Sequence, residues 1–128
     1  MELTRIDPEG VPVLPNGGYS NALLVDGASR LLFVSGQIPQ TPTGEVPTDI
    51  ESQCRLAWAH VFAALMAASM EVSNLVKVTT FLSDRVHSRI NTAVRNEVLG
   101  DHRHALTVII ADIFLPAWLV EIEAIAAA

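Results

Sequence analysis

Two glutamates near the carboxyl end, Glu121 and Glu123, have the type and spacing to do chemistry. They stand two residues apart in the apolar run 118–125, and the two-residue repeat of a β-strand puts both on one face with Leu119 and Ile125. Carboxylates in an apolar strand are costly unless each is paired or solvated. The pattern indicates either a subunit boundary, where they pair with arginine or backbone amides, or a functional role for Glu121.

His102 and His104 also stand two residues apart, a spacing that suits a metal site or a general acid–base pair. No third ligand stands at a suitable spacing, and zinc needs three or four ligands. We therefore expect a solvated loop at these histidines, with no metal. His60 and Cys54 fall within a helical pattern and are expected in the core or at its edge.

The composition predicts an oligomer. Of the 128 residues 50% are hydrophobic and 17% are charged, whereas about 25% charged is usual. A small domain has a large surface for its volume, so this shortage of charge predicts that another subunit covers part of the surface. The net charge of −6 speaks against nucleic-acid partners.

The composition and the apolar segments also predict where in the cell the protein is found. Cys54 is the single cysteine, so no internal disulfide is expected. Residues 1–10 lack the apolar segment of a signal peptide, and the longest apolar stretch, 56–70, is shorter than the roughly 18 residues of a membrane span. We expect a cytoplasmic protein without membrane contact, organised as one domain over residues 1–128.

The first half of the chain predicts a hairpin and a long helix. Apolar runs at 22–25 and 31–35 flank an Asp-Gly loop, which is typical of a β-hairpin. A capping box, Thr48 to Glu51, then opens an amphipathic helix of about five turns that reaches Ala68. A second stripe, Trp58, Phe62 and Met66, widens its predicted buried face.

The second half predicts a strand over 75–82, a helix from Asp84 to Gly100, and strands over 105–110 and 118–125. The arginines of that helix are expected on a solvated, salt-bridged surface; they are Arg85, Arg89 and Arg95. This order predicts an α+β fold with two helices on one face of a single sheet. Symmetric self-association is the expected cover for the other face.

Five segments of the chain resemble the RidA/YjgF family, which is also called endoribonuclease L-PSP or translation initiation inhibitor. The most specific are the Ser-Gly-Gln-Ile-Pro run and the Glu-Ile-Glu-Ala-Ile-Ala ending. The five segments are 17–22, 32–39, 43–47, 76–82 and 120–126.

The resemblance implies a chorismate-mutase-like fold that assembles as a homotrimer, with small-molecule clefts between subunits. The family's best-known members hydrolyse enamines and imines, such as 2-aminoacrylate, and no cofactor is implied. In them a tyrosine lines the cleft, an arginine on the penultimate strand holds the substrate carboxylate, and a glutamate on the last strand positions water.

Carried onto this chain, the tyrosine corresponds to Tyr19 and the glutamate to Glu121. The arginine, fifteen positions before that glutamate, corresponds to Leu106, which offers no hydrogen-bond donor. Asn91 is a further predicted ligand-binding residue. Arg103 is a candidate substitute anchor, as is an arginine of a neighbouring subunit, although its odd offset from Leu106 directs it to the other strand face.

Three functional hypotheses follow. The first is a divergent member that binds a small molecule, an amine or neutral ligand rather than a carboxylate, without standard deaminase activity. The second is an imine deaminase with a substitute arginine. The third, a ribonuclease or translation inhibitor, comes from the family's older names alone and lacks electrostatic support.

Overall fold

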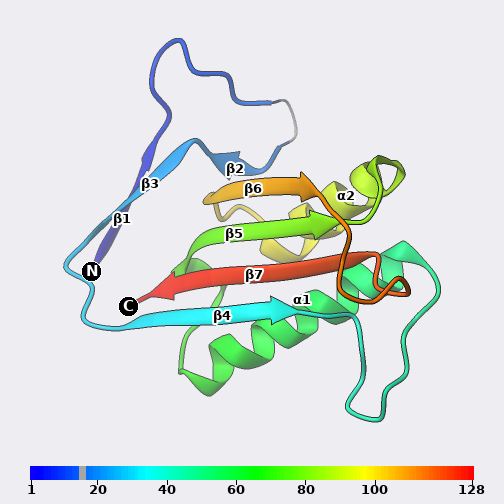
Figure 1. The fold of residues 1–128 in the computed structure, drawn as a ribbon. Helices are drawn as coiled ribbons and strands as arrows, with labels where there is room; N and C mark the ends of the chain where they lie inside the picture. Colours follow the sequence, from blue (N-terminus) through cyan, green and yellow to red (C-terminus); the bar gives the residue numbers. More distant parts are fainter. Residues whose placement is uncertain (15–16) are drawn as a thin grey trace.

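The structure is a computed structural model that describes residues 1–14 and 17–128. A five-stranded sheet, in the order β2-β6-β5-β7-β4, carries two helices on one face (Figure 1). A separate two-stranded sheet pairs β1 (Glu2–Ile6) with β3 (Ala22–Asp26). The large sheet and its helices consist of β2 (Tyr19–Ser20), β4 (Leu31–Gln37), α1 (Ile50–Ala67), β5 (Leu75–Leu82), α2 (Ser88–Leu99), β6 (His104–Ile110) and β7 (Val120–Ala127). Short 3₁₀ turns, Val72–Asn74 and Arg85–His87, precede β5 and α2. The predicted α+β fold is confirmed.

The predicted hairpin is wrong, although both of its strands form. β3 pairs antiparallel with β1, where Val25 lies opposite Leu3, and β4 pairs antiparallel with β7, where Phe33 lies opposite Ile125. Gly27, at a φ of 72°, lies in the loop between the two strands. The pairing differs because β4 pairs with the largely apolar β7 and β3 pairs with β1. The sequence pattern did not predict β1.

Helix α1 has the predicted length but a different first residue. The carboxylate of Asp49, not the hydroxyl of Thr48, caps it by accepting a hydrogen bond from the Ser52 N–H at 2.8 Å. Cys54 and Leu65 are buried against the sheet, as expected. Met66 is 72% exposed, so the predicted second stripe ends one turn early.

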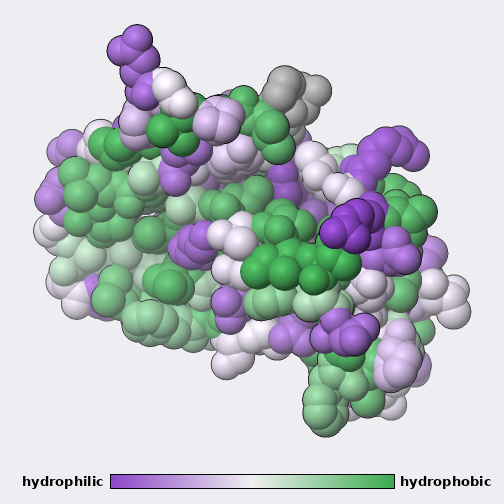
Figure 2. All heavy atoms as spheres, turned by 45° about the horizontal axis from the view of Figure 1, so that its top comes forward, coloured by the Kyte–Doolittle hydropathy of each residue, from purple (hydrophilic) through white to green (hydrophobic). Residues whose placement is uncertain are grey.

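The pleat of the sheet separates two sets of side chains. Val78 of β5 and Ile122 of β7 are fully buried beneath the helices. Glu121 and Glu123 alternate with Ile122, so they lie on the opposite face, as the sequence predicts. Phe33, 69% exposed, belongs to that uncovered face, and Figure 2 shows broad apolar areas on the side of the molecule in view.

No helix among the described residues has the length and apolar character to cross a membrane.

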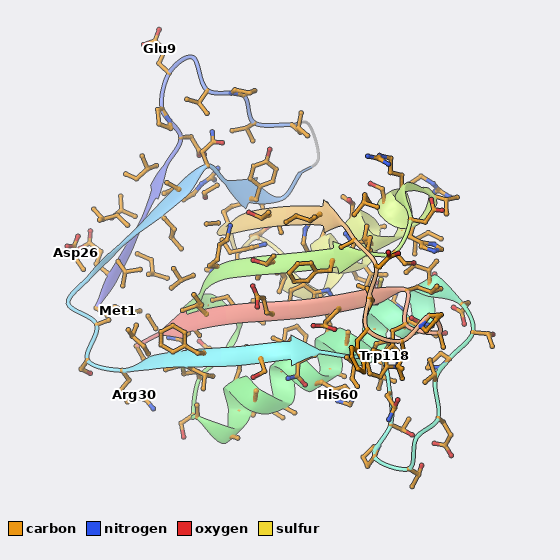
Figure 3. The ribbon with its side chains drawn as sticks, viewed as in Figure 1. Met1, Glu9, Asp26, Arg30, His60 and Trp118 are labelled. Carbon is orange, nitrogen blue, oxygen red and sulfur yellow. The ribbon has the colours of Figure 1, made fainter. Side chains whose placement is uncertain are left out.

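The loop after β4 is held to α1 by two polar side chains. His60 of α1 lies with its Nε2 2.8 Å from the carbonyl oxygen of Gln40 (Figure 3). Gln53, buried on the same helix, donates to the carbonyl oxygens of Pro47 and Ala117 and accepts from the Leu119 N–H, all within 2.9 Å. The Gln53 side chain therefore holds both this loop and the turn before β7 against α1.

Replacing Gln53 with alanine should lower the free energy of unfolding by about 2–4 kcal/mol, because three hydrogen bonds are lost and backbone groups are left unpaired. Urea denaturation measures the change. Met66→Ala, at a position of the same helix that is 72% exposed, is the control and should change stability by less than about 0.5 kcal/mol. Equal stability of both variants would show that Gln53 does not hold these segments.

Candidate functional site

Glu121 lies on the uncovered sheet face, across from Phe81 of β5. An added Cβ at Gly36 of β4 would overlap the Glu121 carboxylate, so glycine at this position makes room for that group. A hollow of about 410 Å³ beside Glu121 is lined by Phe81, Ala111, Asp112, Ile113 and Phe114. It contains two carboxylates and no lysine or arginine among its described lining residues.

Tyr19 and Leu106 share a second cavity, of about 490 Å³, between β2, β6 and α2. Tyr19 is placed there by the parallel pairing of β2 with β6, and its hydroxyl oxygen accepts a hydrogen bond from the Leu14 N–H at 3.1 Å. Leu106 lies opposite Val78 and packs against the core, on the helix side. Tyr19 and Leu106 therefore lie together, whereas Glu121 faces away from them across the sheet.

The remaining predicted site residues lie elsewhere. Arg103 donates to the carbonyl oxygens of Gly100 at 3.0 Å and of His102 at 3.4 Å, and it lines a shallow depression away from Tyr19 and Leu106. Asn91 is 2% exposed on α2 and is not among the residues that line the Tyr19 cavity. The chain does not bring either residue to Glu121.

Arg95 corrects the prediction of a solvated arginine surface on α2. Its side chain lines the Tyr19 cavity, is 3% exposed, and donates through Nη2 to the Gly17 carbonyl oxygen at 2.6 Å. Burial lowers the pKa of this guanidinium. A signal was present in the sequence: Arg95 stands four residues from Asn91 and from Leu99, on the buried stripe of the helix.

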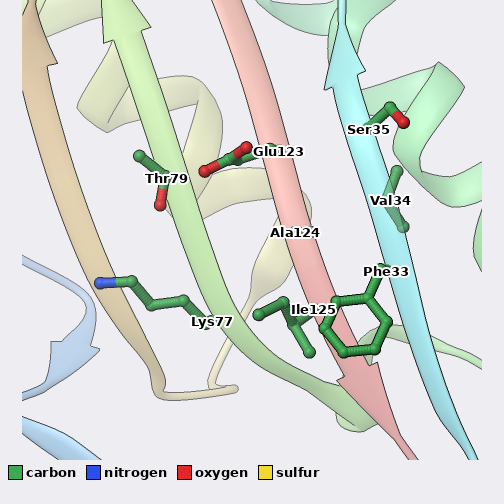
Figure 4. A pocket seen from close by; sticks show the side chains of 8 residues that line it. All are labelled: Phe33, Val34, Ser35, Lys77, Thr79, Glu123, Ala124 and Ile125. Carbon is green, nitrogen blue, oxygen red and sulfur yellow. The ribbon is translucent and has the colours of Figure 1, made fainter.

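Lys77 is a second residue that sequence reasoning missed. It projects with Thr79 and Glu123 into a cavity of about 260 Å³ on the uncovered sheet face (Figure 4). Its Nζ donates to the Thr107 hydroxyl at 2.6 Å. A lysine inside the apolar strand at 75–82 was the available signal, since it must point away from the core.

The histidine pair is not a solvated loop, which corrects the prediction. His102 lies with Nε2 2.6 Å from the Leu75 carbonyl oxygen, and His104, fully buried, begins β6. Neither ring nitrogen of His104 has a hydrogen-bond partner among the described residues. Burial, followed by the positive charge of Arg95, lowers the pKa of His104 to about 3. Within residues 1–14 and 17–128 no cluster of three or more metal-ligating side chains occurs.

Comparison with known proteins now identifies the class. The fold matches a crystal structure of a Rid-family protein of unknown function, YyfB from Yersinia pestis, with a TM-score of 0.87 over all of both chains, at 23% identity. The family model described as endoribonuclease L-PSP matches residues 11–128. The chain therefore belongs to the endoribonuclease L-PSP family, the RidA/YjgF family, as its motifs predict.

Two relatives have higher sequence identity. A RutC family protein of Pyrococcus horikoshii is 36% identical over 114 residues, 88% of each chain. TdcF of Escherichia coli, which is named for a reactive intermediate deaminase activity, is 44% identical over 55 residues, so that match spans 42% of this chain and 43% of TdcF. A crystal structure of TdcF with bound serine superposes with a TM-score of 0.73, at 29% identity over 91% of both chains.

Because His104 is buried and neutral, we predict that the native state loses stability in acid. An unfolded histidine takes up a proton near pH 6.5, whereas His104 in the native chain does so near pH 3. Native stability is therefore undiminished above pH 6.5 and falls, as the pH drops from 6.5 towards 3, by up to about 1.4 kcal/mol per pH unit.

His104→Leu should remove this contribution and flatten the pH dependence, measured by urea denaturation at pH 7, 6 and 5. His87→Leu, at a partly exposed histidine, is the matched control. The same slope in His104→Leu and the native chain would contradict the assignment of a neutral, unpaired His104.

Proposed function

We propose that this chain is a divergent member of its family, a single domain over residues 1–128 that binds a small molecule in clefts between the subunits of a homotrimer. It acts in the cytoplasm and lacks standard 2-aminoacrylate deaminase activity. Support for the loss of activity comes from β6, His104–Ile110, which contains neither arginine nor lysine. A one-residue shift in the alignment therefore does not restore a cation at the position of Leu106.

Leucine at position 106 weakens the binding of a substrate carboxylate. A guanidinium holds a carboxylate by two charge-assisted hydrogen bonds in a fixed geometry, and the Leu106 side chain has no donor. Loss of such a contact in a sheltered cleft costs on the order of 2–5 kcal/mol of binding free energy. The hollow at Glu121 does not compensate, because Asp112 adds a second carboxylate that repels an acid ligand.

The trimer is part of the proposal for a geometric reason. Tyr19 and Leu106 lie on the helix side of the sheet, whereas Glu121 lies on the uncovered side. One chain does not place both sets of groups against one small ligand, so a neighbouring copy must complete the cleft. The uncovered apolar face offers a surface for that contact.

Arg103 has no anchoring role in this proposal. Its guanidinium is held by the carbonyl oxygens of Gly100 and His102. Glu121 keeps the family position of the residue that orients water, and Gly36 leaves room for its carboxylate. The cleft therefore keeps its polar groups but lacks the arginine that would hold the carboxylate of the substrate.

The test is hydrolysis of freshly generated 2-aminoacrylate or 2-iminopropanoate at high protein concentration. Relative to an arginine-bearing family member, kcat/KM should be lower by about 30- to 5,000-fold, which is the 2–5 kcal/mol above at roughly 1.4 kcal/mol per decade. Turnover comparable to that relative would overturn the proposal, and Glu121→Gln would then show whether the rate arises at Glu121.

A further inference from the structure

We propose that the uncovered face of the large sheet binds a second copy of this chain through an ion pair that crosses the interface, from Lys77 of one subunit to Glu123 of the next. The inference rests on the homotrimer of the proposed function and assigns residues that join its subunits. In a ring of three copies each chain gives its lysine to one neighbour and its carboxylate to the other, so every one of these charges is paired.

The first observation is a band of polar side chains that crosses this face between two largely apolar rows. Thr79 of β5 lies opposite Thr107 of β6 on one side and opposite Glu123 of β7 on the other. The apolar members of the adjoining rows are Ala105, Ile125 and Phe33 beside Lys77, and Ile109 and Phe81 beside Glu121. Apolar surface around a few placed polar groups is the pattern of a protein–protein interface.

Lys77 and Glu123 share this face without forming an ion pair with each other. The Lys77 side chain extends towards β6, where its Nζ donates to the Thr107 hydroxyl at 2.6 Å, whereas Glu123 extends from β7 towards Thr79 (Figure 4). The ion pairs among the described residues involve Arg5 and Arg55 only, with their acidic partners. Two N–H donors of Lys77 and the carboxylate of Glu123 are therefore available to a partner outside the chain.

The apolar side chains of this face favour its burial. Phe33 is 69% exposed and Ile109 is 44% exposed, in a chain of which only 17% is charged. Removing such groups from water drives association, but a charge that is buried with them is costly unless it is paired. Covering this face therefore requires that Lys77 and Glu123 each meet an opposite charge.

A second copy of the chain meets this requirement without any other partner. The face carries both signs of charge, so a head-to-tail contact sets the ammonium of Lys77 in one chain against the carboxylate of Glu123 in the next. A partner whose surface has a single sign of charge would pair with one of these groups and repel the other. The charges of the face therefore favour self-association.

The experiment measures self-association by sedimentation velocity over a range of protein concentrations. We expect the native chain to be a trimer. Lys77→Glu and Glu123→Lys each place like charges across the contact, and each should raise the concentration of half-dissociation by about 30-fold or more. Arg89→Glu and Glu9→Lys, which reverse a charge at exposed positions outside this face, are the matched controls and should leave that concentration unchanged.

A mixture of Lys77→Glu and Glu123→Lys distinguishes a contact between subunits from one within a chain. In a mixed trimer two of the three contacts again set opposite charges together, so the mixture should form trimers at concentrations where each variant alone is dissociated. A mixture that stays dissociated, although circular dichroism shows both variants folded, would overturn the inference. So would native-like association of either variant alone.

Neutral variants decide the question if the reversed chains do not fold. Lys77→Gln and Glu123→Gln should each weaken the trimer, and the double variant should dissociate no more readily than either single variant, because the two residues act as one pair. Additive losses would contradict the pairing.

The outcomes also separate this inference from the proposed function. A native trimer that is insensitive to every one of these variants would overturn the ion pair and leave the trimer standing. A monomeric native chain would overturn both the ion pair and the trimer. The loss of deaminase activity is tested separately, by turnover of 2-aminoacrylate.

Discussion

Strand β7 is hydrogen-bonded on both sides, to β5 and to β4, and the rest of the structure depends on this double pairing. Because both neighbours hold its register, each side chain of β7 is assigned to one face of the sheet. Ile122 is buried under the helices, so Glu121 and Glu123 must face the other way. A slip of one residue would bury both carboxylates and expose the apolar set.

The same alternation explains why candidate functional groups are divided between the two sides of the sheet. Leu106 lies opposite Val78 and faces the helices, while Lys77 and Glu123 occupy the uncovered face. The helix side gathers positive charge at Arg95, and the hollow beside Glu121 gathers negative charge with Asp112. Arg95 and the pair of carboxylates at Glu121 and Asp112 thus lie on opposite faces of the sheet.

Sequence reasoning succeeded where local pattern and burial agree. The strand at 75–82 was predicted with its observed bounds, and the helix after Asp84 ends before Gly100, whose φ of 59° suits glycine. Sequence reasoning failed where a strand distant in the sequence decides which strands pair. The runs at 22–25 and 31–35 have good hairpin chemistry, yet each pairs with a strand from an end of the chain.

For the polar and charged residues, too, some features were predictable from the sequence and others were not. The sequence alone determined the family, the α+β class, the common face of Glu121 and Glu123, and the lack of a cation at Leu106, since these follow from motif, period and residue type. Tertiary structure decided that Arg95 and His104 are buried and that Tyr19 lies beside Leu106. The physical reason is that burial of a polar side chain depends on what packs over it, and here that cover comes from segments far apart in the sequence.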